Sequence, residues 1–281
     1  MVTQGLVGEN LLKTISFQKS LVKAHIRRQL PWPRSTALKK PIFIVGSSRS
    51  GTTILAEVLS HSPELYSFTE HPLVRRHMWS MVANLDKVDT ELPELQKTLV
   101  RLSGICAPER LLEKTPGHSL LVKPMADYFT DAKFIHIIRD ARDVASSMLK
   151  HEWIADELRE IHPVFWFHLL PPVFQKQWPN LDLWERAILR WAVYLDAARG
   201  ISSYDERYME VRYEEMCQAP QECFDAILEF SELDSFPELE FQISTIQPKS
   251  ANRWKMQSFT QRQKKFYLNV LDQFNITMSV R

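Results

Sequence analysis

The sequence predicts an α/β fold, in which a mainly parallel five-stranded sheet is flanked by helices in three layers. Two observations favour this class. Short apolar runs alternate with stretches at helical spacing, and 281 residues are enough to bury a sizeable core. A content of 44% hydrophobic and 25% charged residues is typical of a globular protein. We expect one domain over residues 1–281, with a helical extension at residues 1–40 and a helical insertion at residues 151–191.

Five runs are predicted as strands because they are short, largely apolar and each is followed by a helical stretch. They are Ile42–Val45, Leu65–Phe68, Arg110–Glu113, Lys133–Ile138 and Tyr208–Arg212. The helical stretches are Ile54–Ser60, residues 72–102, Val144–Lys150 and Pro220–Ser231. Ligands of parallel sheets bind beyond the carboxyl ends of the strands. The functional residues should therefore follow directly after each strand.

Two segments lie outside this alternation. Residues 8–28 place apolar residues at helical spacing with basic residues between them, and Pro31-Trp-Pro33 ends the stretch. We interpret it as a helix that packs on the domain, with contact to a membrane surface as the alternative. Residues 151–191 are rich in tryptophan, phenylalanine and proline, and are predicted to form a helical insertion or lid. The alternative for these rings is that they simply pack a helical subdomain.

Charge and cysteine content exclude several classes of function. A net charge of +1 gives no global attraction for nucleic acid or acidic membranes, so any anion site must be local. The cysteines Cys106, Cys217 and Cys223 form no CxxC pair, which argues against a disulfide framework or a zinc site. Basic residues interrupt every apolar run before Pro31, and no run is long enough to span a membrane. We expect a cytoplasmic protein with no transmembrane segment.

The segment Gly46-Ser-Ser-Arg-Ser-Gly-Thr-Thr53 joins the first strand to a helix and has the features of an anion-binding loop. Two of the seven glycines lie in it, and they allow the backbone to curl close to a ligand. The helix start adds N–H donors and the positive end of its dipole. Nucleoside triphosphatases have lysine where this loop has Thr52, and here the cation is Arg49. This difference counts against a kinase or ATPase.

A second basic site follows the fourth strand. Arg139 emerges where that strand ends, and Ser147 lies one to two turns into the next helix, where it could donate to the same anion. For Arg142 and Asp143 we favour ion pairs that cap the helix, whereas for Arg139 we favour a ligand. The sequence therefore predicts two separated anion sites, one after the first strand and one after the fourth.

These two sites make the chain resemble the sulfotransferases that use 3′-phosphoadenosine 5′-phosphosulfate (PAPS). The branch most similar contains carbohydrate, tyrosylprotein and many bacterial sulfotransferases, whose loop reads Arg-Ser-Gly-[Thr/Ser]-[Thr/Ser]. Arg49-Ser-Gly-Thr-Thr53 matches that loop, which wraps the 5′-phosphosulfate in the family. Arg139 and Ser147 match the family's pair for the 3′-phosphate.

The resemblance covers roughly residues 41–235 and implies a P-loop-like fold. Val211–Met216, followed by Pro220, resembles the family segment Arg-Tyr-Glu-Asp-Leu, in which Tyr213 would lie near the nucleotide. The Arg-Lys-Gly motif of the cytosolic small-molecule branch is missing, and Arg253, Trp254 and Lys255 are the candidate replacements. The implied cofactor-binding residues are Ser48, Arg49, Ser50, Gly51, Thr52, Thr53, Arg139, Ser147, Tyr213 and Arg253.

The resemblance also implies three catalytic residues: Glu70, Lys114 and Arg49. Glu70 follows the second strand, 21 residues after Arg49, and would act as the base for the acceptor's proton. Lys114 follows the third strand and would steady the bridging oxygen and the leaving phosphate. His71 and His118 are rival bases.

Other interpretations of these residues stay open. Glu70 could instead be a surface carboxylate paired with Arg75 or Arg76, and Lys114 an ordinary surface lysine. If rings from residues 151–191 line the pocket, the acceptor would be a sugar face or a lipid-like alcohol. We expect no metal and no nucleic acid. The expected acceptor is a hydroxyl, with an amine as the less favoured alternative, on a carbohydrate, lipid-like or other small molecule. The alternative functions are a P-loop kinase or phosphotransferase and a non-catalytic nucleotide-binding protein. The sequence does not predict an oligomeric state.

Overall fold

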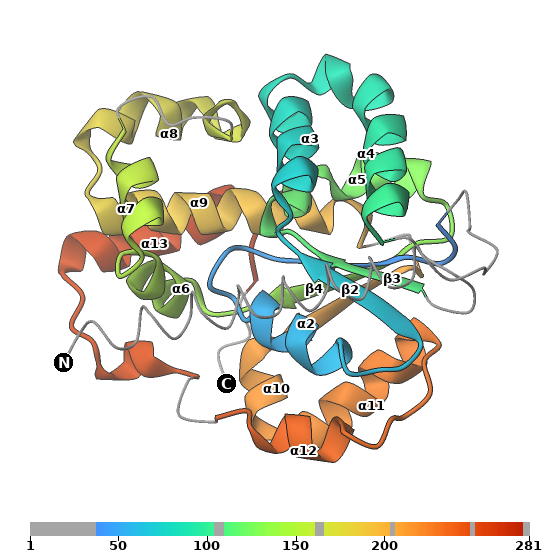
Figure 1. Ribbon diagram of the computed structural model, residues 1–281. Coiled ribbons are helices and arrows are strands. Elements are labelled where there is room, and N and C mark those ends of the chain that lie inside the picture. The colour runs from blue at the N-terminus through green and yellow to red at the C-terminus, as the bar shows by residue number, and fades with distance from the viewer. Residues whose placement is uncertain (1–37, 104–109, 161–165, 203–205, 248–250, 278–281) are drawn as a thin grey trace.

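A computed structural model describes residues 38–103, 110–160, 166–202, 206–247 and 251–277 (Figure 1). The helix expected at residues 8–28, and Cys106, lie outside these ranges. Among the helices of the described ranges, none is long and apolar enough to cross a membrane.

The sheet has five parallel strands in the order β2-β3-β1-β4-β5, which confirms the predicted fold class. The strands are β1 (Ile42–Val45), β2 (Leu65–Thr69), β3 (Arg110–Lys114), β4 (Lys133–Ile138) and β5 (Tyr208–Arg212). Three have the predicted bounds, and β2 and β3 each extend one residue further, to Thr69 and Lys114. All five carboxyl ends therefore point to one edge of the sheet.

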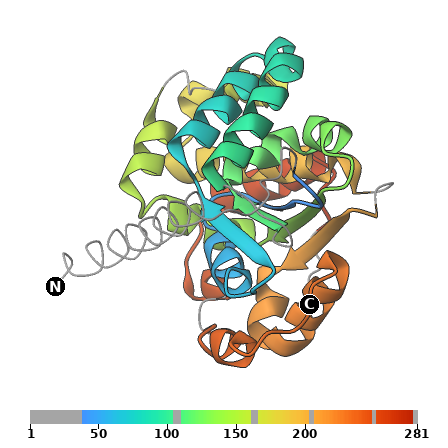
Figure 2. The same cartoon turned by 45° about the vertical axis from the view of Figure 1, so that its right-hand side comes forward.

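Two apolar cores cover the two faces of the sheet, because side chains alternate along each strand. In β1, Phe43 and Val45 join the core on one face, whereas Ile42 and Ile44 join the core on the other. The first core is closed by α3, α4, α5 and α9, and the second by α2, α10, α11 and α12 (Figures 1 and 2). The helices of this three-layer fold are α2 (Thr52–Leu59), α3 (Pro72–Ala83), α4 (Val88–Ser103), α5 (Val122–Tyr128), α6 (Ala141–Met148), α7 (Glu152–Arg159), α8 (Pro172–Gln177), α9 (Leu183–Ala198), α10 (Tyr213–Gln218), α11 (Pro220–Ser231), α12 (Leu239–Ser244) and α13 (Gln261–Gln273).

Three of the four predicted helical stretches have the wrong bounds. The helix expected at Ile54–Ser60 begins two residues earlier and ends one residue earlier, at Thr52–Leu59. The stretch at residues 72–102 is two helices, because Asn84 adopts extended backbone and its side chain accepts a hydrogen bond from the Asp86 N–H. The helix expected from Val144 begins three residues earlier, because the Asp140 carboxylate caps it by accepting from the Arg142 N–H at 2.9 Å.

Most aromatic rings of residues 151–191 pack in the core. The buried ones are Trp166, Phe174, Trp178, Trp184 and Trp191. Phe174 stacks on Phe274 of the chain's last described segment. Among the described rings of this segment, Phe167 is half-buried and Trp153 is exposed, at 49%. A role for this segment over the acceptor stays a prediction.

His136 in β4 makes folding sensitive to acid. Its Nδ1 lies 2.5 Å from the Tyr208 hydroxyl, which itself donates to Glu210 at 2.9 Å, so this ring nitrogen donates to the hydroxyl oxygen. Burial lowers the pKa of His136 to about 4. The unfolded chain takes up this proton near pH 6.5, and the folded chain only near pH 4. Stability is therefore complete above pH 6.5 and is lost as the pH falls toward 4.

We expect protonation of His136 to lower the free energy of unfolding by about 2 kcal/mol between pH 7 and pH 5. Denaturant titrations at pH 7, 6 and 5 measure the loss. His136→Gln keeps a polar side chain but cannot titrate, so its stability should depend less on pH over this range. Equal pH slopes for the two proteins would contradict the prediction.

Candidate functional site

Residues 46–53 form a tight loop between β1 and α2, and both of its glycines are required by the geometry. Gly46 has a φ of +146°, and a Cβ there would lie 2.5 Å from the Ile137 carbonyl oxygen. Gly51 has a φ of +103°, and a Cβ there would lie 2.4 Å from the ring of Tyr213. The loop therefore lies directly against β4 and the start of α10.

The loop holds polar groups that a ligand would satisfy. It is closed by a hydrogen bond from the Ser50 N–H to the Ser47 carbonyl at 3.1 Å. The hydroxyls of Ser47 and Ser50 are buried and make no hydrogen bond to other described residues. Buried polar atoms are almost always hydrogen-bonded, and these two lie beside the N-terminus of α2. The arrangement fits an anion bound in the loop.

The loop and α6 meet through two arginines. Arg49, at a φ of +75°, donates from its Nε to the Ser147 hydroxyl at 3.1 Å. Arg139 donates from its Nη1 to the Arg49 carbonyl at 3.3 Å. Three residues predicted to bind opposite ends of one nucleotide are therefore in direct contact.

Two aromatic side chains hold Arg139 in place. The Arg139 guanidinium lies 4.4 Å from the ring centroid of Tyr213, which also packs against Gly51. The Trp191 indole N–H donates to the Arg139 carbonyl at 3.0 Å. Tyr213 was expected near the nucleotide, and its ring packs against the Arg139 guanidinium. The sequence did not predict the contact of Trp191 with Arg139, because nothing in it links α9 to the end of β4.

Glu70 and Lys114 come together where β2 and β3 end. The strands are paired so that Thr69 lies opposite Lys114, and the Glu70 N–H donates to the Lys114 carbonyl at 2.9 Å. The Lys114 ammonium forms an ion pair with the Glu70 carboxylate and donates to the Thr53 hydroxyl at 3.3 Å. Its side chain is 2% exposed, so it is not an ordinary surface lysine, and that of Glu70 is 34% exposed.

The alternative partners for Glu70 are less well supported. The guanidinium of Arg75 lies 4.6 Å from the ring centroid of Trp79. Glu70 adopts a left-handed φ of +50°, which is costly for a residue with a side chain. The ion pair with Lys114, which also contacts Thr53, brings the Glu70 carboxylate beside the anion-binding loop.

The two rival bases have other contacts. His71 caps α3, since its Nδ1 accepts from the Leu73 N–H at 3.2 Å, and burial lowers the pKa of His71. His118 is fully buried with its Nδ1 2.8 Å from the Glu113 carboxylate, which accepts from the Thr115 hydroxyl at 2.6 Å. The sequence did not reveal this buried pair.

Arg253 reaches the site through its backbone. It begins a short 3-10 turn, Arg253–Met256, and its N–H donates to the Asp143 carboxylate at 3.2 Å. Arg142 pairs with Asp140 at 2.6 Å, and Asp143 also forms an ion pair, as expected for these two residues. The partner of Asp143 is Arg139, at 3.4 Å, for which a ligand was favoured. Ser119 was missed: its hydroxyl accepts from the Gly46 N–H at 2.7 Å and fixes the start of the loop.

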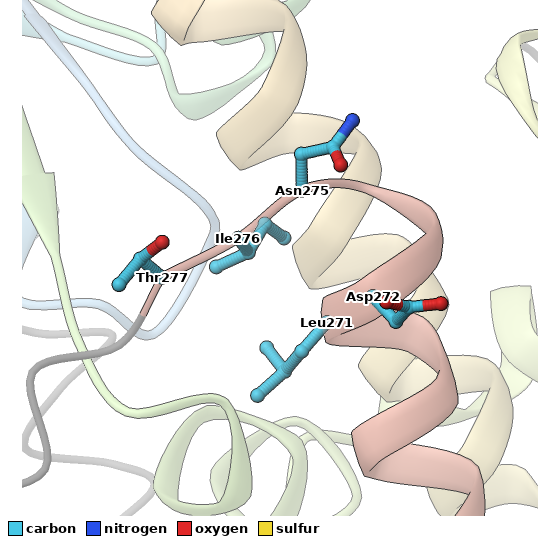
Figure 3. A pocket seen from close by; sticks show the side chains of 5 residues that line it. All are labelled: Leu271, Asp272, Asn275, Ile276 and Thr277. Carbon is cyan, nitrogen blue, oxygen red and sulfur yellow. The ribbon is translucent and has the colours of Figure 1, made fainter.

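A separate depression of 380 Å³ lies at the end of α13 (Figure 3). Its lining residues are Leu271, Asp272, Asn275, Ile276 and Thr277. None of them is basic and none belongs to the predicted motifs, so this depression does not suit an anionic nucleotide. Within the described ranges, no three histidine, cysteine or carboxylate side chains are grouped to hold a metal ion.

The family model described as Sulfotransferase family matches residues 41–238. The chain belongs to the sulfotransferase family. The sulfotransferase domain from the curacin biosynthetic pathway is structurally similar, with a TM-score of 0.59, 18% identity, and coverage of 86% of this chain and 100% of that one. A mouse sulfotransferase complexed with PAP has a TM-score of 0.54 and 16% identity, and covers 87% of this chain and 88% of its own.

A relative found by sequence comparison tells less about the function of this sulfotransferase-family chain than the family match does. An uncharacterized protein of Aquifex aeolicus (strain VF5) is 25% identical in an alignment of 213 residues, which covers 69% of this chain. The alignment takes in 26% of that protein, so the chain spans about a quarter of its length. The predicted fold and family are confirmed, and the assigned roles of the site residues stay predictions.

Proposed function

We propose that the protein transfers a sulfuryl group from PAPS to a hydroxyl of a carbohydrate, lipid-like or other small acceptor. The observation that carries this proposal is the position of Lys114. Its buried ammonium contacts both the Glu70 carboxylate and Thr53 of the anion-binding loop. A base and a cation therefore adjoin the place where the transferring group would be bound.

Each of these residues would have its own role in the transfer. The acceptor oxygen forms a bond to sulfur as the bond from sulfur to the bridging oxygen breaks, and the electron pair of that bond leaves with the phosphate. Glu70 takes the proton of the acceptor hydroxyl. Lys114 and Arg49 neutralise charge that develops on the bridging and transferring oxygens. The loop and the N-terminus of α2 keep the donor in line with the acceptor.

The cofactor assignment is supported by two groups of residues, which meet where Arg49 contacts Ser147. The loop and its unsatisfied hydroxyls suit the 5′ end, and Arg139 with Ser147 suits a 3′-phosphate. A structural neighbour was solved in complex with PAP, the nucleotide that remains after transfer. The thiols of Cys217 and Cys223 are free, which supports a reducing, cytoplasmic location.

Titration of the purified protein with nucleotides tests the proposal. We expect PAP to raise the melting temperature without added metal, and ATP with magnesium to raise it less. A screen of alcohols, glycolipids and phenols with sulfur-labelled PAPS should then yield a labelled acceptor. Stabilisation by ATP with magnesium alone would favour the phosphotransferase alternative. Binding of PAP without transfer to any acceptor would favour a non-catalytic binding protein.

A further inference from the structure

Asp143 occupies an unexpected position for an acidic residue. Arg139, Asp143 and Ser147 are spaced by four residues, so they follow one face of α6 and the turn before it. The carboxylate therefore lies between the two groups proposed to hold a 3′-phosphate. By charge alone it would repel that phosphate, so another interaction must account for its presence.

The contacts of Asp143 supply this interaction. Its side chain is fully buried. One oxygen accepts from the Trp254 N–H at 2.6 Å, and the other from the Arg253 N–H at 3.2 Å. The second oxygen also lies 3.4 Å from Nη2 of Arg139. One carboxylate thus joins the proposed phosphate-binding arginine to a turn that is more than one hundred residues away in the sequence.

The turn has further contacts with α6. The guanidinium of Arg142 lies 3.1 Å from the ring centroid of Trp254, and the Ser146 hydroxyl donates to Gln257 at 2.6 Å. Asn252, just before the turn, adopts a left-handed φ of +55°. The segment is therefore held by several residues of α6, with Asp143 as its charged contact.

We propose that Asp143 is a positioning residue for recognition of a 3′-phosphate. It orients Arg139 and fixes the turn Arg253–Met256 against α6, so that cationic groups from both segments face the same anion. This role rests on the proposed function, because it assumes that a nucleotide with a 3′-phosphate binds here.

The Asp143→Asn variant separates positioning from simple charge. Its amide can no longer accept from all three donors, so we expect affinity for PAP to fall roughly tenfold or more, the effect of losing a charge-assisted hydrogen bond. Affinity for adenosine 5′-monophosphate, which lacks the 3′-phosphate, should stay unchanged. If Asp143 acted only as a nearby negative charge, the variant would bind PAP more tightly, and that result would overturn the inference.

Calorimetric titration of the full chain with both nucleotides gives these affinities. Asp182→Asn is the matched control, since Asp182 also accepts a backbone N–H, at the start of α9, and its loss should leave the ratio of PAP to monophosphate affinity unchanged. Ser146→Ala releases Gln257 and leaves Asp143 in place, so it should lower PAP affinity roughly fivefold, with the monophosphate unaffected.

If Asp143→Asn does not fold, Asp143→Glu replaces it, because the longer side chain keeps the charge but shifts the carboxylate away from its three donors. An unchanged ratio of PAP to monophosphate affinity in that variant would overturn the inference. Failure of the unaltered protein to bind PAP would overturn the proposed function itself. Normal binding of PAP by the unaltered protein, with an equal affinity in Asp143→Asn, would overturn the role of Asp143 alone.

Discussion

Replacing Lys114 with methionine is expected to lower kcat by about 10²- to 10³-fold, the usual effect of removing a group that stabilises transition-state charge. The ammonium lies within hydrogen-bonding distance of Thr53 in the loop, where it can neutralise charge on the leaving phosphate. Methionine fills a similar volume. The variant should fold, because Glu70 is partly exposed and water can solvate its carboxylate once the ion pair is lost.

Single-turnover measurements with sulfur-labelled PAPS would give the rate, and calorimetric titration the affinity for PAP. We expect the rate to fall far more than the affinity, because the interaction is made mainly in the transition state. Lys123→Met is the matched control: this exposed lysine pairs with Asp127 at 3.3 Å and should have no effect. A Lys114→Met enzyme that turns over at the normal rate would rule out the proposed role of Lys114.

Replacing Glu70 with glutamine is expected to lower kcat by about 10²- to 10⁴-fold, because the general base is lost while the shape of the side chain is kept. The size of the defect should depend on the acceptor. An alcohol must lose its proton to a base, whereas an acidic phenol gives it up readily. The defect should therefore shrink as the pKa of the acceptor falls.

A series of phenols and alcohols with graded acidity measures this dependence. Glu57→Gln, an exposed carboxylate on α2, is the control and should behave like the unaltered protein. If the Glu70→Gln defect were the same for every acceptor, Glu70 would be orienting groups rather than taking a proton. His71 or His118 would then have to be tested as the base.

Much of the fold could be predicted from the sequence because its signals are local. Apolar runs such as Ile42–Val45 and Lys133–Ile138 specify strands over their whole length, and the glycines at 46 and 51 mark a turn that only glycine can make. Helix boundaries were less accurate where a cap decided them. Asp140 starts α6 earlier than the apolar pattern indicated, and Asn84 interrupts a stretch that is otherwise helical.

The candidate site was only partly accessible to the same reasoning. Motif residues that end strands, such as Glu70 and Lys114, meet because parallel strands bring their ends together. The contacts of Ser119, Trp191 and Asp143 could not be inferred, since each joins segments that are distant in sequence. The aromatic residues of 151–191 are a further example. They can be counted in the sequence, but whether they line a pocket or pack in the core could not be predicted from it.

The backbone at Arg49 and Glu70 has a consequence for engineering the protein. Both adopt left-handed φ values, +75° and +50°, at which glycine would relieve about 1 kcal/mol of strain each. A screen for heat resistance that ignored activity would therefore favour glycine at position 49. At position 70 the same change would leave the buried Lys114 ammonium without its carboxylate, which costs more than the strain. A protein selected in this way would gain stability at the expense of the Arg49 side chain, on which sulfuryl transfer is proposed to depend.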